Sequence, residues 1–265
     1  MASLKGIACN DITDIANLNA LNLQWLHTEW CLACYSDPPL TLLPATVEWV
    51  FHMFETVPQV ADVQLMLTKN IYHKRWYCVG GNEPVPSTSN WNQYTELAID
   101  QMEAILLGDP NAKFALTMSS QHYLPGNKYG NQIWVDGVWM RLPKKLKQRV
   151  RAFHWHFYPQ ELLGSNDTGI FNKKHIQQQG VLVQKHINTK LIDSGGKQSW
   201  ITEIGLTESE LTLSDVRSKY YPYVVQEACD NVGVTMWAWY KLEGADAYFN
   251  LYGSNAVAYE SFTQI

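Results

Sequence analysis

This sequence of 265 residues has little charge and no excess of basic side chains. Charged residues make up 17% of it, and 20 Lys and Arg face 25 Asp and Glu, for a formal net charge of -5. Binding to nucleic-acid phosphates needs a basic patch, so we expect no nucleic-acid partner. The one basic run, LPKKLKQRVR at residues 142–151, has apolar residues at four-residue spacing, which predicts an amphipathic helix with a solvated face.

Long hydrophobic runs are also absent. No uncharged stretch approaches the roughly 18–20 residues that a membrane-spanning helix needs, so we expect no membrane partner. The opening residues, MASLKGIACND, lack the hydrophobic segment of a signal peptide. We therefore expect a chain without a secretion signal, which fits a cytoplasmic protein or the trimmed form of a secreted one.

Cysteine is scarce, with five residues scattered along the chain. An odd number in a chain of this size favours reduced thiols over a disulfide framework. Cys31 and Cys34 have CxxC spacing, but no second pair accompanies them, so we predict neither zinc nor redox chemistry there. No GxGxxG or Walker sequence follows the first apolar run, which argues against an open doubly wound sheet, the second choice of fold.

Aromatic residues, in contrast, are abundant, with 11 Trp, 14 Tyr and 8 Phe. Many of these rings belong in a core. A surplus of Trp beside polar residues also fits a cleft that stacks on the flat apolar faces of sugar rings. Composition alone leaves both interpretations open.

Short apolar runs and helical segments alternate along the chain. Eight runs predict strands, at residues 5–10, 22–27, 62–68, 75–80, 113–119, 151–158, 199–205 and 234–240. Helical periodicity appears between most of them, at residues 46–57, 91–108, 173–195 and 214–233. Near-continuous apolar strands that alternate with helices predict a parallel sheet covered on both faces. Eight such units in about 250 residues predict a (β/α)8 barrel, a single α/β domain over residues 1–265.

Carboxylates stand where two of the predicted strands end. In a barrel of this kind the carboxyl ends of the strands carry the active site. Asn82 and Glu83 follow the fourth strand in VGGNEP, and Glu203 ends the seventh in WITEIG. The two glycines predict a tight turn that directs Glu83 toward Glu203. Two carboxylates about 5–5.5 Å apart match the retaining glycosidases, in which one attacks the sugar and the other acts as acid and then base.

The sixth strand ends in HWHFY. Alternation along a strand sends His154, His156 and Tyr158 into the barrel and the two rings between them outward. The chemistry needs one ionised and one protonated carboxyl group at the same pH. Hydrogen bonds from Asn82 and Tyr158 would keep Glu203 ionised, whereas an apolar wall would let the other glutamate keep its proton.

Together these motifs resemble those of the clan A glycoside hydrolases, which include retaining cellulases, mannanases, xylosidases and β-1,3-glucanases. The resemblance lies in GGNEP, HFYP, WITEIG, and WYKL followed by FNLYGSNAVAYESF. It implies a (β/α)8 barrel that hydrolyses β-glycosides with retention, acts on an oligo- or polysaccharide, and uses neither a metal nor an organic cofactor.

The resemblance also implies roles for individual residues. Glu83 would be the acid/base and Glu203 the nucleophile. Asn82 would hydrogen-bond the sugar 2-hydroxyl, Tyr158 would contact the nucleophile, and His156 would orient the glutamates or bind sugar.

Further residues would line the cleft. By the same resemblance, Trp239 would form a platform under the sugar at the cleavage point. Many families of the clan place an arginine at the end of the second strand, but this chain has WLHTEW there. We therefore expect His27, Glu29 or Trp30 to line the cleft instead, and His122 to contact sugar.

No inserted second domain interrupts the sequence to close the barrel mouth. We therefore expect an open cleft and an endo-acting monomer, with β-glucan as the first substrate and β-mannan or xylan next. Two alternatives stay open. His154 and His156, at i and i+2 on one strand, fit a metal-dependent barrel hydrolase, and a barrel that binds carbohydrate without cleaving it is the other.

Overall fold

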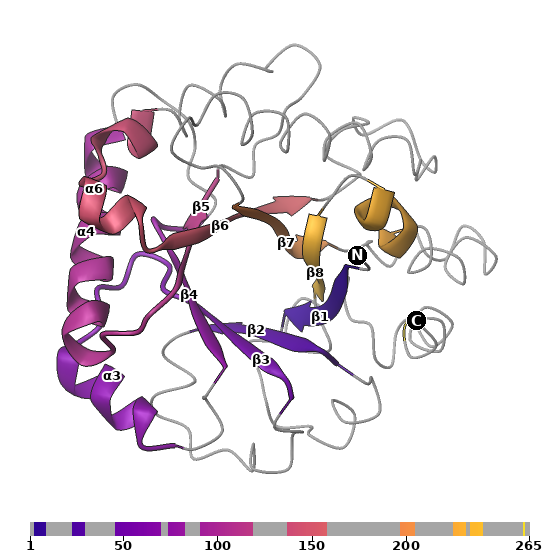
Figure 1. The fold of residues 1–265 in the computed structure, drawn as a ribbon, viewed down its shortest axis with the longest axis horizontal. Helices are drawn as coiled ribbons and strands as arrows, with labels where there is room; N and C mark the ends of the chain where they lie inside the picture. The colour runs from indigo at the N-terminus through magenta and orange to yellow at the C-terminus, as the bar shows by residue number, and fades with distance from the viewer. Residues whose placement is uncertain are drawn as a thin grey trace.

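The structure of the chain is a computed structural model. It describes residues 3–8, 23–29, 46–69, 74–82, 91–118, 137–157, 197–204, 225–231, 234–240 and 262. Eight parallel strands follow one another around a closed barrel in chain order (Figure 1). They are β1 (Leu4–Ala8), β2 (Trp25–Glu29), β3 (Glu48–His52), β4 (Arg75–Val79), β5 (Phe114–Thr117), β6 (Val150–Phe157), β7 (Gln198–Ile204) and β8 (Val234–Tyr240). The predicted (β/α)8 barrel is confirmed.

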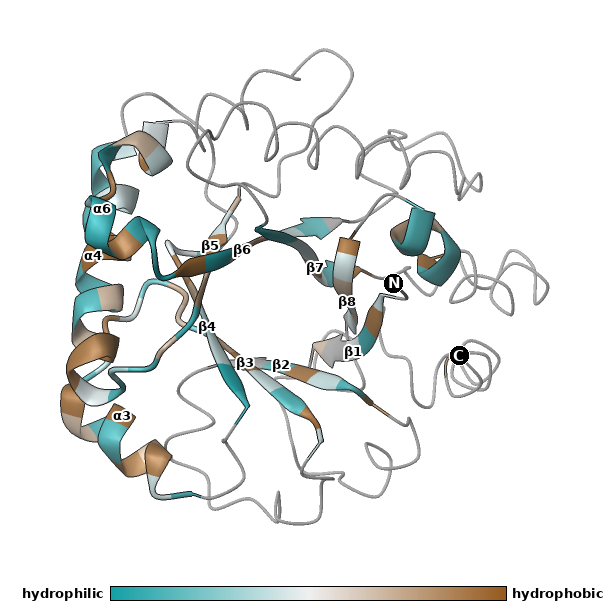
Figure 2. Cartoon of the chain, viewed as in Figure 1, coloured by the Kyte–Doolittle hydropathy of each residue, from teal (hydrophilic) through white to brown (hydrophobic). Residues whose placement is uncertain are grey.

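Helices cover the outside of the barrel. They are α3 (Val60–Leu67), α4 (Trp91–Gly108) and α6 (Lys144–Lys147), and residues 137–141 and 225–231 are helical as well. Helix α3 packs against α4, and α4 packs against β4. Figure 2 shows hydrophobic and hydrophilic bands alternating around these helices, which is the pattern of one buried face and one solvated face. No helix in these ranges is long and apolar enough to cross a membrane.

Two segments exchange the roles that the sequence predicted. Residues 46–57, expected to be helical, contain strand β3, and residues 62–68, expected to be a strand, form most of helix α3. A strand buried on both faces loses its alternation, so the apolar spacing of EWVFH also fits a helix. In α3 only Val63 and Met66 are buried, and a helix this short and apolar has no period that separates it from a strand.

The other predicted elements lie close to the observed ones. Helix α4 has the predicted bounds, and β8 does too. The basic run at 142–151 is a weaker match, because its helix α6 is a single turn and β6 begins at Val150. Of the predicted helix at 214–233 the structure describes residues 225–231, which are helical. The predicted helix at 173–195 lies outside the described residues.

The strands have two buried faces with different roles. The outer face packs under the helices as one large core that includes Phe51, Tyr77, Phe153 and Ile201. The inner face closes the lower part of the barrel with Trp25, Trp76, Trp200, Val50, Cys78, Ala115, Ala152, Met236 and Ala238.

Three indole rings fill the floor of the barrel. Trp200 lies 4.9 Å from Trp76 and 6.5 Å from Trp25, between ring centroids. Gly6 on β1 makes room for them, because a Cβ atom there would lie 2.5 Å from the ring of Trp25. The polar residues of the inner face therefore gather above this floor, at the carboxyl ends of the strands.

Two of the cysteines lie within the described ranges. Cys78 and Cys229 are both free and buried, as expected for reduced thiols. Cys31 and Cys34, the CxxC pair, lie outside the described residues.

Candidate active site

The chain leaves strand β4 through two glycines in the left-handed region. Gly80 has a φ of +101° and Gly81 of +87°, which glycine adopts without steric cost. The buried backbone N–H of Gly80 donates to Oε1 of Gln101 at 2.8 Å, and the hydroxyl of Thr117 lies 2.9 Å from the carbonyl oxygen of Gly81. The tight turn predicted from the sequence is present and is anchored from two sides.

This turn presents Asn82 at the barrel mouth. The backbone N–H of Asn82 donates to Oε1 of Glu55 at 3.1 Å. Its side-chain Oδ1 is buried and finds no hydrogen-bond partner within the described part of the chain. An amide oxygen in that position is available to a ligand hydroxyl. Glu83, the next residue, lies outside the described residues.

A β-bulge directs Glu203 into the barrel. Along β7, Ile201 pairs with Trp155 of β6 and Glu203 pairs with His156, so Thr202 is an extra residue without a partner in the ladder. Such a residue re-aims the side chains around it. Thr202 and Glu203 consequently both contact histidines of the inner face, rather than alternating between the two faces.

Glu203 is nearly buried beside an imidazole. The residue is 9% exposed, and its Oε2 lies 3.3 Å from Nδ1 of His156. His154 and His156 both point inward and Trp155 packs in the outer core, so the predicted alternation of these three residues is confirmed. The imidazole of His156 is in a position to orient the carboxylate.

Four histidines meet in the mouth. The ring of His52 on β3 lies 5.2 Å from His27, 5.2 Å from His154 and 6.1 Å from His156, between centroids. The half-buried ring of Phe54 stacks on His52, with 4.3 Å between the centroids. The barrel brings these rings together from three strands that are far apart in the sequence.

Burial keeps most of these imidazoles neutral. Desolvation lowers the pKa of His52 to about 3 and lowers the pKa values of His27 and His154 well below the usual range, and neighbouring imidazoles lower all three further. At neutral pH these rings are therefore uncharged hydrogen-bonding groups.

The nitrogens of His154 are both occupied by hydroxyl groups. Its Nε2 lies 2.7 Å from Oγ1 of Thr117, and its Nδ1 lies 3.0 Å from Oγ1 of Thr202. This arrangement leaves His154 no nitrogen for a metal ion. It contradicts the alternative in which His154 and His156 form the metal pair of a barrel hydrolase.

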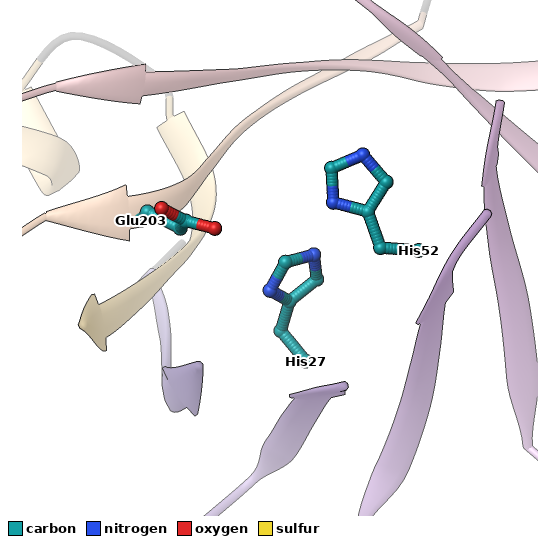
Figure 3. Close-up of side chains that lie close together, drawn as sticks. All are labelled: His27, His52 and Glu203. Atoms are coloured by element: carbon teal, nitrogen blue, oxygen red, sulfur yellow. The ribbon is translucent and has the colours of Figure 1, made fainter. Parts of the chain in front are cut away.

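His27 and His52 differ from His154 in this respect. Nε2 of His27 and Nδ1 of His52 are buried and have no hydrogen-bond partner in the ranges described. One nitrogen of each of these two imidazoles and one carboxylate oxygen of Glu203 lie within 4.8 Å of one another. Figure 3 shows the two imidazoles side by side, with the carboxylate pointing toward them.

Sequence reasoning found one of these two histidines and missed the other. It named His27 as one of three candidates, with Glu29 and Trp30, to line the cleft at the end of the second strand, and the structure places the His27 side chain in the lumen. It passed over His52 because the segment around it was interpreted as a helix. The signal that was available is a polar residue that ends the apolar run EWVFH.

Trp239 does not lie where the resemblance implied. Its ring is fully buried in the outer core beside Trp237, and both rings contact Phe262 edge-on, at 6.4 and 5.5 Å. A buried ring on the outer face of β8 cannot stack on a sugar in the mouth. The prediction of a Trp239 platform is therefore wrong, because on this strand Met236 and Ala238 take the inner face.

The remaining predicted contacts fall on other parts of the chain. Tyr158, Trp30 and His122 lie outside the described residues, and so does the side chain of Glu29. For these positions the sequence predictions stay predictions.

The geometry defines a class of protein: a closed (β/α)8 barrel whose carboxyl-end mouth holds a buried carboxylate, four imidazoles and an amide. No protein-family model and no curated protein sequence matches the chain. Solved structures share its fold.

Three of the similar structures are those of a cellulose synthase subunit and two endoglucanases. Cellulose synthase subunit Z from Clostridioides difficile has a TM-score of 0.62 and 12% identity over 99% of both chains. A family 5 broad-specificity endoglucanase from Clostridium acetobutylicum has a TM-score of 0.58 and 11% identity, and the match covers 100% of this chain and 98% of the endoglucanase chain. A family 5 xyloglucan-specific endo-β-1,4-glucanase from a metagenomic library, solved with cellotriose, has a TM-score of 0.55 and 12% identity. This match covers 96% of the present chain and 88% of the glucanase chain. At these identities the likeness shows the fold.

Proposed function

We propose that this chain is a retaining β-glycoside hydrolase, with Glu203 as the nucleophile and Glu83 as the acid/base. The observation that carries the proposal is the carboxylate of Glu203, which a β-bulge holds nearly buried at the mouth, 3.3 Å from His156. The endoglucanases and the xyloglucanase with the same fold support the choice of reaction class.

The reaction would proceed by double displacement. An oxygen of Glu203 attacks the anomeric carbon and forms an ester bond, while the glycosidic oxygen leaves with the proton of Glu83. Water then attacks the same carbon, gives its proton to Glu83 and releases Glu203 as a carboxylate. Two inversions at one carbon retain the configuration.

Other residues of the mouth would position the sugar. Oδ1 of Asn82, buried and without a partner in the described residues, is suited to accept a hydrogen bond from the 2-hydroxyl group. His156 would hold the orientation of Glu203, and Tyr158 would donate to the same carboxylate. Trp30 and His122 are proposed to contact more distant sugar units.

The proposed substrate is a polysaccharide cut within the chain. β-Glucan is the first choice, because a broad-specificity endoglucanase and a xyloglucan-specific endo-β-1,4-glucanase are among the structures with this fold. β-Mannan and xylan follow. The proposed unit of action is the monomer, since a single barrel supplies both carboxylates.

The test is product release from a panel of β-glucans, mannan, xylan and chitosan by the intact chain and by Glu203→Gln. We expect one polymer to be cleaved by the intact chain alone, with a loss in the variant of roughly 10⁴-fold or more, the scale on which removal of a nucleophile acts. Equal cleavage by Glu203→Gln would exclude the proposed nucleophile. Binding of a glycan without cleavage by the intact chain would favour a carbohydrate-binding barrel.

Azide separates the roles of the two glutamates. In Glu203→Ala, azide should restore turnover and give a product of inverted configuration. In Glu83→Ala, substrates with good leaving groups should still form the glycosyl-enzyme, and azide should give a β-glycosyl azide. Full activity in either variant would remove that residue from its role.

A further inference from the structure

Two buried nitrogens in the mouth are not needed for the proposed chemistry. Nε2 of His27 and Nδ1 of His52 have no hydrogen-bond partner in the described residues, and the two residues are 3% and 0% exposed. Leaving a buried polar atom unsatisfied costs about 1–3 kcal/mol. The two rings are neighbours, with 5.2 Å between their centroids, so one ligand that both contact would satisfy both atoms.

The contact between His52 and the carbonyl oxygen of Gly81 indicates which nitrogen of His52 can bind a metal ion. Its Nε2 lies 3.4 Å from the carbonyl oxygen of Gly81, and a carbonyl can only accept a hydrogen bond. The proton of the neutral ring is therefore on Nε2, and Nδ1 carries the lone pair. Histidines that bind metal ions are oriented in this way, with the other nitrogen donating to a backbone carbonyl.

The carboxylate of Glu203 completes a set of three ligands. One atom from each of His27, His52 and Glu203 lies within 4.8 Å of the other two (Figure 3). Zinc bonds of about 2.0–2.1 Å set two tetrahedral ligands roughly 3.4 Å apart, so small side-chain rotations bring the three onto one ion. Nδ1 of His156, 3.3 Å from Oε2 of Glu203, is a further contact of this carboxylate.

We propose that His27, His52 and Glu203 form a binding site for a divalent transition-metal ion, best suited to zinc, and that the bound ion blocks hydrolysis. Two imidazoles and one carboxylate are a ligand set that zinc accepts, with a fourth position left for water. Calcium and magnesium prefer sites made of oxygen atoms and fit this set poorly.

The proposed inhibition of hydrolysis follows because the metal site and the proposed catalytic site both use the carboxylate of Glu203. An oxygen of Glu203 that coordinates the ion has its lone pair engaged and cannot attack an anomeric carbon. The binding site stands on its own geometry. The inhibition rests on the proposed function, since it requires Glu203 to be the nucleophile.

The test begins with the full chain freed of metal by a chelator and titrated with Zn²⁺ in a calorimeter. We expect one ion per chain at the barrel site. His27→Gln and His52→Gln should each weaken binding by about 100-fold or more, because even loss of an outer partner of a metal ligand costs roughly 10- to 100-fold.

Two matched variants control for the rest of the barrel. His154→Gln changes a buried imidazole whose nitrogens are both bound to hydroxyls, and Cys78→Ala removes the buried thiol of the inner face. Both should bind Zn²⁺ as the unmodified chain does, with folding checked by circular dichroism. Zinc binding that is absent, or that survives both His27→Gln and His52→Gln, would overturn the site.

Cobalt gives a readout that does not depend on the variants folding. Co²⁺ in the unmodified chain should give the visible absorption of a tetrahedral site with nitrogen and oxygen ligands. A thiolate-to-cobalt band, or no such absorption, would overturn the assignment.

Hydrolysis is then measured with and without Zn²⁺. Loss of activity with added Zn²⁺, restored by chelator, is expected. Zinc binding at the histidines without cleavage of any glycan by the metal-free chain would overturn the proposed function and leave the metal site standing. Activity that increases with Zn²⁺ would overturn the inhibition.

Discussion

At the scale of single residues, the histidines of the mouth differ in what their nitrogens contact. His154 is held between the hydroxyls of Thr117 and Thr202 and has a structural role. His52 has one nitrogen near a backbone carbonyl and the other without a partner in the described residues. The same side chain, equally buried, is thus a fixed part of the wall in one place and an available ligand in the other.

Gly81 is a second residue whose role depends on local geometry. A Cβ atom there would lie 2.8 Å from Cε1 of Tyr94, and its φ is +87°. We expect Gly81→Ala to lower the free energy of unfolding by more than the roughly 1–2 kcal/mol that left-handed backbone costs a non-glycine residue, as measured by urea denaturation.

Gly80→Ala is the matched control for this prediction. Gly80 has a φ of +101°, but a Cβ atom added there would have Cδ1 of Leu116 as its nearest neighbour, at 3.4 Å, which is an ordinary contact. We therefore expect Gly80→Ala to lower the free energy of unfolding by less than Gly81→Ala does. An equal or larger loss in Gly80→Ala would show that the contact with Tyr94 does not matter.

At the scale of elements, helix α4 holds two loops of the candidate site through one buried side chain. Gln101 accepts a hydrogen bond from the N–H of Gly80 and donates to the carbonyl oxygens of Phe54 and Thr56, at 2.8, 2.8 and 3.0 Å. It thereby ties the exit of β4 to the loop between β3 and α3. Both loops lie beside the candidate site, so helix α4 helps to position it through Gln101.

Gln101→Leu should therefore be costly. The substitution keeps much of the volume but leaves one N–H and two carbonyl oxygens without their partner. We expect a loss of about 1–3 kcal/mol in the free energy of unfolding, the cost of leaving the buried N–H of Gly80 unsatisfied, because the two carbonyl oxygens are only partly buried. Gln93→Leu, on the exposed side of the same helix, should change it by less than about 0.5 kcal/mol. Similar effects of the two substitutions would contradict this role.

At the scale of the whole molecule, closure of the barrel buries three imidazoles in surroundings that disfavour their protonation. Desolvation first, and neighbouring imidazoles second, depress the pKa values of His27, His52 and His154. In the unfolded chain the same groups take up protons below about pH 6.5. Protons therefore bind preferentially to the unfolded state, and acid destabilises the fold.

The expected pH dependence has a definite sign. The free energy of unfolding should be highest above about pH 7 and should fall as the pH drops below about 6.5, toward the pKa of about 3 for His52. His154→Gln removes one such group and should make the slope shallower by up to about 1.4 kcal/mol per pH unit. Chemical denaturation of both proteins between pH 7.5 and 5 measures this, and identical slopes would contradict it.

Much of the barrel was predictable, and part of the site was. The strand ends at Asn82, His156 and Glu203 were found because polar residues at the ends of apolar runs are conspicuous. His52 and the position of Trp239 were not, because β3 has two buried faces and β8 carries rings on one face and small residues on the other. Neither pattern indicates from the sequence which face of the strand points into the barrel.

The sequence by itself determined the number of strands, their parallel arrangement and the carboxylate at the end of the seventh strand. These depend on local patterns of apolar residues, glycine and turns. Only the tertiary structure decided that Thr202 forms a bulge, that Glu203 thereby faces the lumen, and that His27 and His52 lie beside it. The physical reason is that barrel closure and strand register, which no local pattern encodes, set the distances between residues on different strands.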